Sequence, residues 1–437
     1  MLKVIAAAVL LSGPFDDSSR VSVTLTPLAE GLNEAVGGTE QIFGSDLAAF
    51  PDGSGRLLVT TLGGPIRLID ETLQATPFLD TFSADTVNGN NGNASFGLTT
   101  LVFHPNFALP GQPGSGCFYT VEPEVTRTSP APDFPGIRPD IGGSNPAHDR
   151  VLYEYCMDDI QADVFAGARR EVLRIHEHRR GHDVNDLAFD EDQYLLMSVG
   201  DTVVEASAQE LDNVFGTMLR IDPLAPARRP GSADPISANG AYRIPVDNPF
   251  GMLAGALPET YALGLRNPFR IHIDGPDLWV SSNGASSRES VYRVVAGDNL
   301  GWPYFEGTRA RGGEPSGFSY VPPVFEYDHG LGLSVTGIVI YRGTEIPELA
   351  GQAVFSDFLG PGASGARLFV GDPGTGIFRD LEAAAGGVPI PDTIISIGQD
   401  LSGEVYLISG EGAVLTVTGG GVIFANGFEG ARLQGPG

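Results

Sequence analysis

A unit of three short strands recurs along the chain, and this repetition restricts the fold more than any other feature. Each unit is an apolar strand, a turn rich in Asp, Pro or Gly, a second strand, a turn that contains Gly, and a third strand. Repetition of this kind is typical of folds that are built from similar blades. The six copies begin near residues 46, 99, 185, 269, 336 and 393.

The repetition predicts an all-β protein, a six-bladed β-propeller that occupies residues 20–418. The early strand at residues 21–28 is free to complete the last blade and close the ring. With 59 Gly and 33 Pro residues, long helices are disfavoured. A pair of β-sandwiches is the alternative, but it does not explain why the units recur to the end of the chain. In propellers the ligand usually lies over the central channel, and we expect the site there.

The two ends of the chain carry signals of their own. Residues 1–19 contain one positive charge and an apolar run from Val4 to Leu11. This pattern resembles a short secretory leader and predicts a periplasmic or secreted bacterial protein. An ordinary first strand or a misplaced start codon would also explain it. Residues 419–437 lie beyond the last unit and are expected to be a disordered end or a sorting signal.

The cysteines and the charge limit the redox state and the partners. Cys117 and Cys156 lie in two strand-like runs, so a disulfide in an exported protein and two buried thiols both remain open. The formal net charge of −28 argues against nucleic acid, because phosphate binding needs a basic surface. No segment approaches the roughly 20 apolar residues that are needed to span a bilayer.

Two polar segments are the strongest local candidates for a ligand site. His182 precedes a strand, where a loop would hold it at a channel mouth, and an imidazole can accept a proton from a hydroxyl group near neutral pH. A solvated histidine beside Asp183 and Asp186 is the alternative. Arg266 and Asn267 lie at a turn before a proline, where a guanidinium can grip a carboxylate or simply cap carbonyls. The chain has no GxSxG, CxxC or dinucleotide-binding motif, so hydrolase and nicotinamide chemistry have little support.

Several long strings resemble the soluble glucose/sorbosone dehydrogenases, a family that includes hedgehog-interacting-protein-like members. They are GLTTLVFHPNFA (97–108), DLAFDEDQYLLMSVGD (186–201), AQELDNVFGTMLRIDP (208–223), YRIPVDNPF (242–250), YALGLRNPFR (261–270) and DNLGWPYFEGT (298–308). The resemblance runs from about residue 28 to residue 418. It implies a six-bladed propeller that binds pyrroloquinoline quinone (PQQ) and calcium and oxidises sugars.

The resemblance also assigns roles to the two polar segments. His182 falls on the family's catalytic base, which takes the proton of the sugar's anomeric hydroxyl while hydride passes to the quinone. Arg266 and Asn267 fall on the pair that contacts the reactive carbonyl region of the cofactor. These three residues are therefore the expected catalytic and cofactor-binding residues of the third and fourth blades.

For the metal, the match to the family is partial. Gly284 and Ala285 fall on the calcium-binding turn, where backbone carbonyls would be ligands. Glu289 falls on one member of the family's acidic pair, and the second position is Ser290. A calcium ion bound by oxygen atoms would make the quinone a stronger hydride acceptor.

The last blade departs most from the sugar-oxidising members. The two arginines that grip the carboxylates of the quinone correspond here to Thr393 and Ile395. Arg342 and Arg367 in the fifth blade are the replacements that the sequence offers. In addition, His182 is not followed by the usual glycines, and the string IGQDLSGEVY resembles the hedgehog-interacting branch.

Together these observations predict an exported, PQQ- and calcium-dependent dehydrogenase that oxidises an aldose or polyol and delivers electrons to an external acceptor. A catalytically inactive propeller that binds carbohydrate or protein at the channel mouth is the alternative. A third hypothesis, a lactonase with a metal and acidic ligands, lacks an acidic cluster in the sequence.

Overall fold

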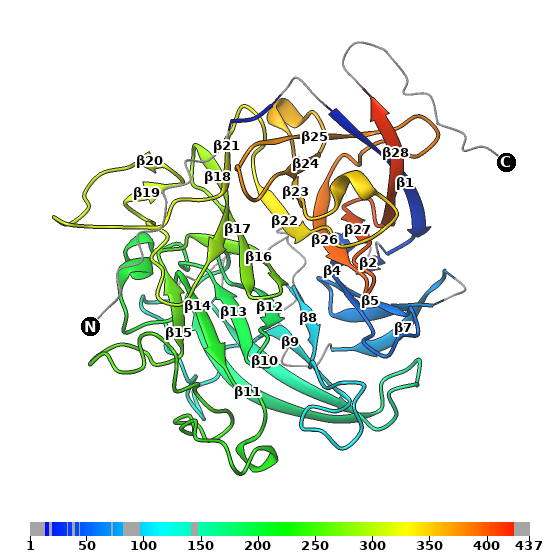
Figure 1. The fold of residues 1–437 in the computed structure, drawn as a ribbon. Coiled ribbons are helices and arrows are strands. Elements are labelled where there is room, and N and C mark those ends of the chain that lie inside the picture. The colour runs from blue at the N-terminus through cyan, green and yellow to red at the C-terminus, as the bar shows by residue number, and fades with distance from the viewer. Residues whose placement is uncertain are drawn as a thin grey trace.

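The computed structural model describes residues 14–16, 20–32, 34–36, 40–42, 44–70, 73–81, 97–140 and 147–423, and all its long elements are β-strands (Figure 1). The predicted all-β class is therefore confirmed. Apart from residues 14–16, the expected leader lies outside the described residues, as does the tail beyond residue 423. In the part of the chain that the structure describes, no helix is long and apolar enough to cross a membrane.

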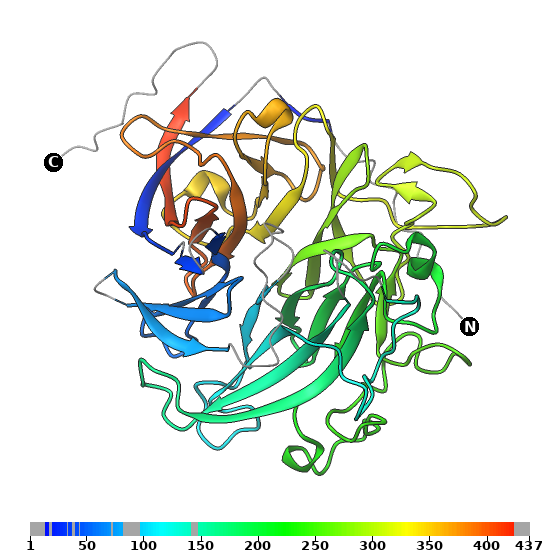
Figure 2. The same ribbon diagram turned by 180° about the vertical axis from the view of Figure 1, so that it is seen from behind.

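Four sheets have four antiparallel strands each, and they stand around a common centre (Figures 1 and 2). Their strands are β4 (Gly44–Ala49), β5 (Leu57–Thr61), β6 (Pro65–Ile69) and β7 (Ala75–Asp80); β8 (Leu101–Phe103), β9 (Cys117–Glu124), β10 (His148–Met157) and β11 (Gly167–Glu177); β12 (Val184–Phe189), β13 (Leu195–Val199), β14 (Thr217–Ile221) and β15 (Thr260–Leu263); and β16 (Asn267–Asp274), β17 (Asp277–Asn283), β18 (Arg288–Val294) and β21 (Phe325–Asp328).

The prediction of six blades is wrong, because the remaining long strands form one eight-stranded sheet. Its order is β22 (Val335–Ile340), β23 (Ala353–Asp357), β24 (Arg367–Gly371), β25 (Phe378–Ala383), β1 (Arg20–Ala29), β28 (Val414–Ile423), β27 (Val405–Ser409) and β26 (Ile394–Gln399). As predicted, β1 pairs with the last strand, β28, in antiparallel fashion. It also pairs in parallel with β25, and this second pairing joins strands that were expected to form two separate blades.

The other elements are short. Two hairpins consist of β2 (Glu34–Val36) with β3 (Glu40–Ile42) and β19 (Phe305–Glu306) with β20 (Arg309–Ala310). The 3-10 helices are η1 (Glu205–Gln209), η2 (Pro226–Arg228), η3 (Pro347–Leu349) and η4 (Pro361–Ala363). The β19–β20 hairpin projects from the side of the molecule in both ribbon views (Figures 1 and 2).

The inner edges of the sheets surround a channel. Strands β4, β8, β12, β16, β22 and β26 contact one another in that order, and β26 contacts β4. Side chains at the beginnings of these strands bond across the gaps between them: Ser45 Oγ donates to the carbonyl of Leu98 (2.5 Å), and Thr336 Oγ1 donates to that of Ile394 (2.9 Å). In the same way Thr99 Oγ1 donates to the carbonyl of Val184 (3.4 Å), and Nδ2 of Asn185 donates to Oδ1 of Asn267 (2.9 Å). Nδ2 of Asn283, beside the start of β16, donates to the carbonyl of Val335 (2.8 Å). All six strands therefore begin at the same end of the channel, and the loops that enter them meet there.

The apolar faces of neighbouring sheets pack against each other and form the core. Between the sheets β8–β11 and β12–β15, for example, Leu152 and Leu173 lie in one buried cluster with Leu195 and Phe215. Burial of each such side chain contributes about 1.5–3 kcal/mol. In the same region, a disulfide joins Cys117 in β9 to its cross-strand partner Cys156 in β10, which decides the question that the sequence left open.

Candidate functional site

The candidate site lies where the loops enter β12 and β16. His182 stands two residues before β12, and Arg266 stands directly before β16. Their loops are tied together through Asp201, whose backbone N–H donates to the carbonyl of Arg266 (2.8 Å). The repeat topology thus brings together two segments that are more than eighty residues apart in the sequence.

His182 and Asp201 form a hydrogen-bonded pair. Nδ1 of His182 lies 2.5 Å from Oδ1 of Asp201, and the side chains are 16% and 1% exposed. Because the carboxylate accepts the Nδ1 proton, the neutral ring carries its lone pair on Nε2. No described residue bonds to Nε2. This arrangement orients the ring through a buried acid and leaves Nε2 available to accept a proton.

The indole of Trp302 holds Asp201 from the other side. Its Nε1–H donates to Oδ2 of Asp201 (2.9 Å), and the backbone N–H of Val203 donates to Oδ1 (2.9 Å). The guanidinium of Arg311 lies over the Trp302 ring at 4.2 Å and forms a two-point ion pair with Glu205. The carboxylate of Asp201 is therefore fixed by three donors and cannot turn away from the imidazole.

The backbone at this pair is unusual. His182, Thr202 and Val203 have φ angles of 57°, 45° and 59°, a region that residues other than glycine rarely occupy. The N–H of Thr202 donates to the carbonyl of His182 (3.3 Å), which joins the two strained segments. Such strain persists only where the surrounding structure imposes it, and it concentrates at functional sites.

Arg266 is directed at a backbone turn and lies beside Trp302. Its Nη1 donates to the carbonyl of Gly284 (2.5 Å) and lies 3.4 Å from that of Asn283, and the guanidinium is 5.6 Å from the centre of the indole. Burial lowers the pKa of Arg266, although nearby carboxylates, with Asp201 first, act in the opposite direction. Because a guanidinium is not deprotonated in proteins, Arg266 remains a cation at the site.

The turn that was expected to bind calcium holds a carboxylate instead. Oε1 of Glu306 accepts hydrogen bonds from the four successive backbone N–H groups of residues 285–288, at 2.7 to 3.2 Å. Oε2 accepts one from the hydroxyl of Ser287 (2.8 Å). These hydrogen bonds lower the pKa of Glu306 to about 2, against the opposing effect of burial.

Calcium does not fit this arrangement. The ion requires six to eight oxygen ligands, but the carbonyl of Gly284 is taken by Arg266, and the carboxylate of Glu306 is held by the backbone N–H groups of the turn. Glu289 is 1% exposed, and its oxygens bond to donors that include the amide of Val335 and the ring of His329. Among the described residues, one cluster brings three His, Cys, Asp or Glu side chains close enough to share a metal ion: Cys117, Glu154 and Cys156. The two cysteines of this cluster form the disulfide, so the cluster is not a calcium site.

Asn267 lies in a chain of three buried amides rather than on an open surface. Nδ2 of Asn185 donates to its Oδ1, and its own Nδ2 donates to Oδ1 of Asn283, both at 2.9 Å. Asn283 continues the chain to Ser334 Oγ (2.9 Å). Asn267 thus links β12 to β17 through its side chain, next to Arg266 in the sequence.

The two arginines that were expected to replace the last-blade pair are not at the site. Arg342 follows β22 at the far end of the channel, where it forms a two-point ion pair with Asp274; six residues of strand, about 20 Å, separate it from the mouth. Arg367 lies at the correct end, but on the third strand of its sheet, and it is paired with Asp380. Ile395 packs in an apolar cluster. The side chains present therefore do not fit the carboxylates of the expected quinone.

Beneath the mouth, Arg270 closes the channel. Its guanidinium donates to the hydroxyl of Ser396 (3.0 Å), to the carbonyl of Asn185 (3.1 Å) and to the carbonyl of Ser45. It is 4% exposed and lies 3.9 Å from the carboxylate of Asp186. One side chain thus links four of the inner strands and separates the His182 site from the far end of the channel.

Three residues that complete the site were not among the sequence candidates. Asp201 ends the string LMSVGD, and Trp302 and Glu306 lie in GWPYFEGT. The sequence predicts a turn at Gly301–Pro303 and a strand in LMSVGD, but these patterns assign no role to Asp201, Trp302 or Glu306. A polar residue at the end of an otherwise apolar strand was the signal that could have selected Asp201.

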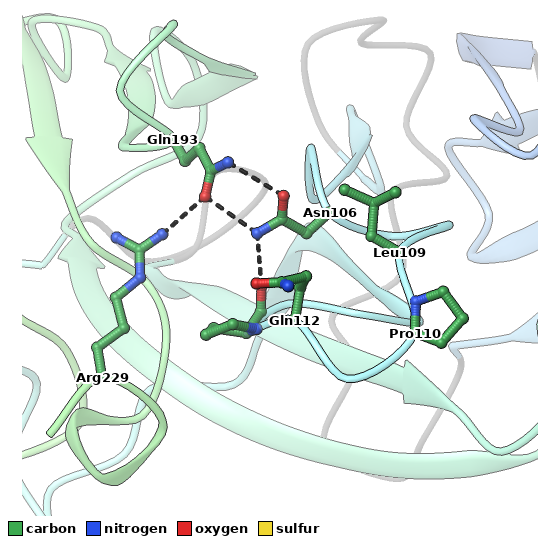
Figure 3. Close-up of a pocket in the computed structure, with 7 residues that line it drawn as sticks. Asn106, Leu109, Pro110, Gln112, Gln193 and Arg229 are labelled. Atoms are coloured by element: carbon green, nitrogen blue, oxygen red, sulfur yellow. Dashed lines mark hydrogen bonds between the residues drawn. The ribbon is translucent and has the colours of Figure 1, made fainter.

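A hollow of about 580 Å³ lies at the end of the sheets that is opposite to His182 (Figure 3). There the amides of Asn106 and Gln193 bond to each other at 3.0 and 3.1 Å, and Arg229 donates to Gln193 (3.0 Å). The polar groups satisfy one another, and none of the predicted site residues lines this hollow.

Comparison with known proteins agrees with the resemblance seen in the sequence. Residues 170–360 match the family model described as Glucose / Sorbosone dehydrogenase, which confirms the family resemblance. HIPL1 protein of Arabidopsis thaliana is 27% identical over 432 residues, covering 85% of this chain and 61% of that protein. Hedgehog-interacting protein of Mus musculus is 26% identical over 384 residues, covering 82% and 47%. The chain thus spans about half to three-fifths of the length of these relatives.

Solved structures show the same fold. The apo-form of the soluble aldose sugar dehydrogenase of Escherichia coli superposes with a TM-score of 0.63 at 19% identity, covering 91% of this chain and 100% of that chain. The PQQ-bound form of aldose sugar dehydrogenase from Streptomyces coelicolor superposes with a TM-score of 0.58 at 18% identity, covering 92% and 99%. These likenesses establish the fold of the chain.

Proposed function

We propose that the protein is an oxidoreductase that removes a proton and a hydride from a hydroxyl-bearing carbon of an aldose or related polyol, with His182 as the general base. The observation that carries this proposal is the pair formed by His182 and Asp201, which leaves Nε2 as a proton acceptor at the channel mouth. The family match at residues 170–360 supports the reaction class.

In this proposal, each residue at the channel mouth has a separate role. Nε2 of His182 takes the hydroxyl proton, and the resulting imidazolium is stabilised by Asp201, which Trp302 holds in place. Arg266 contributes a positive charge at the same mouth, where it can draw toward itself the oxygen or carboxylate of a bound group. Arg270 blocks the channel below, so that the substrate and its partner must enter and leave at one end.

The hydride acceptor is the open part of the proposal. PQQ, when bound, supplies a quinone that accepts hydride, and an external acceptor then removes the electrons. Arg266 lies at the mouth, but Arg367 is paired with Asp380, and the turn expected to bind calcium is occupied by Glu306. We therefore assign no step to PQQ or calcium.

One observation favours the second candidate function, a channel mouth that binds carbohydrate or protein without oxidising it. Arg342 and Arg367 are both engaged in ion pairs with other carboxylates, Asp274 and Asp380. A protein that had lost its cofactor would show this loss of anchoring residues while it kept the fold. The relatives named hedgehog-interacting proteins lend this alternative further weight.

Export also belongs to the proposal. A disulfide between Cys117 and Cys156 suits an oxidising compartment. Together with the leader-like residues 1–19, it supports a periplasmic or secreted location for the unit formed by residues 20–418.

Reconstitution separates the two candidate functions. Purified protein is titrated with PQQ in the presence and absence of calcium, the quinone absorbance is followed, and dye reduction by a panel of aldoses is measured. The oxidoreductase is supported if the quinone spectrum shifts and the dye reduction is lost in His182→Ala. If PQQ does not bind at micromolar concentration while aldoses still bind, the protein is a binding propeller.

A further inference from the structure

A cavity of about 380 Å³ lies on the outside of the molecule, away from the channel, between the sheets β8–β11 and β12–β15. Three loops line it: residues 133–137, residues 212–214 and the long connection between β14 and β15. Its walls are largely apolar. They include Phe134, Val214, Tyr242, Ile244 and Leu257.

Three acidic residues line this cavity: the buried Glu259, the half-buried Asp133 and the exposed Asp212. Glu259 is 5% exposed, and its Oε1 accepts a hydrogen bond from the hydroxyl of Tyr242 (2.8 Å). Oδ2 of Asp133 accepts one from the backbone N–H of Arg174 (2.8 Å). The second oxygen of Glu259 has no side-chain donor among the described residues, although the side chain lines the cavity.

Glu259 has no cation beside it, which sets it apart from the neighbouring acids, whereas Asp133 interacts with the charge of Arg174 and with the side chain of Asn239. Glu124 and Asp149, buried in the adjacent sheet, both contact the guanidinium of Arg174 at 2.6 and 3.1 Å. Glu259 and Asp133 form no ion pair with any described residue, and no Lys, Arg or His lines the cavity. Burial raises the pKa of both carboxyl groups. A buried carboxylate without a cation is costly, and a cation from outside would remove that cost.

We propose that this cavity binds an organic cation, an alkylammonium group attached to an apolar body. The ammonium would lie between Glu259 and Asp133, and the apolar part would pack on Phe134, Tyr242 and Leu257. The rings of Phe134 and Tyr242 also attract a cation through their faces. The cavity volume suits a small organic molecule, and the net charge of −28 attracts cations to the surface. A bare metal ion would leave most of this apolar wall uncovered.

Calorimetry on the full chain at pH 7 tests the proposal with 2-phenylethylamine and its neutral isostere 2-phenylethanol. The amine is charged at this pH because alkylamines have pKa values near 10. We expect saturable binding of the amine and at least about tenfold weaker binding of the alcohol. Glu259→Gln keeps the shape and the bond to Tyr242, and it should weaken amine binding by about tenfold or more. Glu314→Gln, a change of an exposed acid on the projecting loop, is the matched control and should leave binding unchanged.

Asp133→Asn provides a second, independent variant in case Glu259→Gln fails to fold, which thermal unfolding will show. Equal binding of amine and alcohol would overturn the proposal, and so would full-strength amine binding in both variants. Absence of saturable binding at millimolar amine would overturn it as well. None of these outcomes depends on whether the His182 site oxidises sugars.

Discussion

At the scale of single residues, the partners of a side chain decide what it can do. His182 is half-buried and precedes the inner strand β12, whereas His104 is buried and follows the inner strand β8. Burial and the charges of Arg229 and Arg228 lower the pKa of His104 to about 3, so this ring cannot hold a proton near neutral pH. His182 has a buried carboxylate at Nδ1 instead. Only the second arrangement is suited to take a proton and stabilise the product.

His176 offers a direct test of this reasoning. Its Nδ1 contacts Asp149 (2.9 Å) and its Nε2 contacts Asp140 (2.8 Å), and the hydrogen bond to Asp149 is the main reason that its pKa is raised above 6.5. Stability from a raised histidine pKa is fully present below pH 6.5 and is lost as the pH rises through the folded-state value. His176→Gln should therefore cost about 1 kcal/mol at pH 5.5 and clearly less at pH 9, since Asp140 is exposed.

Urea denaturation of wild type and His176→Gln at the two pH values checks this expectation. A loss of stability that is the same at pH 5.5 and pH 9 would show that the two contacts do not depend on the charge of the ring.

At the scale of elements, the turn of residues 284–288 shows a carboxylate replacing the expected metal. Glu306 accepts five hydrogen bonds there, and its pKa falls from 4.5 to about 2. A depressed carboxyl pKa contributes stability above pH 4.5, and this stability is lost as the pH falls toward 2. Glu306→Gln should therefore cost about 2–3 kcal/mol at pH 7 and progressively less below pH 4.5.

Guanidinium denaturation between pH 7 and pH 3.5 measures this difference, with Glu314→Gln, a change of an exposed glutamate, as the control. The account of the turn fails if Glu306→Gln is as stable as the control at pH 7, or if calcium stabilises the wild type strongly.

Gly200 tests how tightly the strained segments pack. A Cβ atom at this position would lie 2.2 Å from the carbonyl oxygen of His182, and the φ of Gly200 is not positive, so that the effect is steric. We expect Gly200→Ala to destabilise the protein by about 1–3 kcal/mol and to displace His182. Gly231 has no atom within 4 Å of its ideal Cβ. Gly231→Ala should change the free energy of unfolding by less than about 0.5 kcal/mol, and equal effects of the two changes would refute the close contact.

The candidate site could be predicted from the sequence only in part. His182 and Arg266 were found because they stand before strands in a repeating unit, and the structure does bring their loops together. The roles of Asn267 and Arg342 depend on which side chain each one meets across the fold. Local sequence patterns do not predict these contacts, because Asn267 bonds to Asn283 and Arg342 pairs with Asp274, and each partner lies in another segment of the chain.

At the scale of the whole molecule, β1 closes the arrangement by joining the first part of the chain to the last. Leu25 in β1 is fully buried in a cluster with side chains of β22–β28, whereas its neighbour Thr26 is exposed. Leu25→Ala should lower the free energy of unfolding by about 2–5 kcal/mol. Thr26→Ala on the opposite face should lower it by less than about 1 kcal/mol.

Chemical denaturation of both variants, followed by tryptophan fluorescence, checks this prediction, because both tryptophans lie in other parts of the fold. If Leu25→Ala leaves the global transition unchanged, β1 is not part of the cooperative unit.

The number of separate sheets could not be predicted, although the all-β class could. The repeats specify where strands occur, and β1 was correctly placed beside the last strands. A strand has two edges, however, and nothing in residues 21–28 shows that the second edge pairs in parallel with residues 381–383 of β25. Pairing between distant segments is a property of the assembled molecule.

The central claim is that His182, held by Asp201, is the base of an oxidation at the channel mouth. The most direct measurement is the rate of dye reduction by an aldose, with each of a panel of quinone acceptors supplied, in wild type, His182→Ala and Asp201→Asn, with His176→Gln as control. We predict that the wild type and the control reduce the dye and that both site variants are slower by about 10²–10⁴-fold. The claim is contradicted if wild type and His182→Ala reduce the dye at the same rate, or if no aldose is oxidised at all.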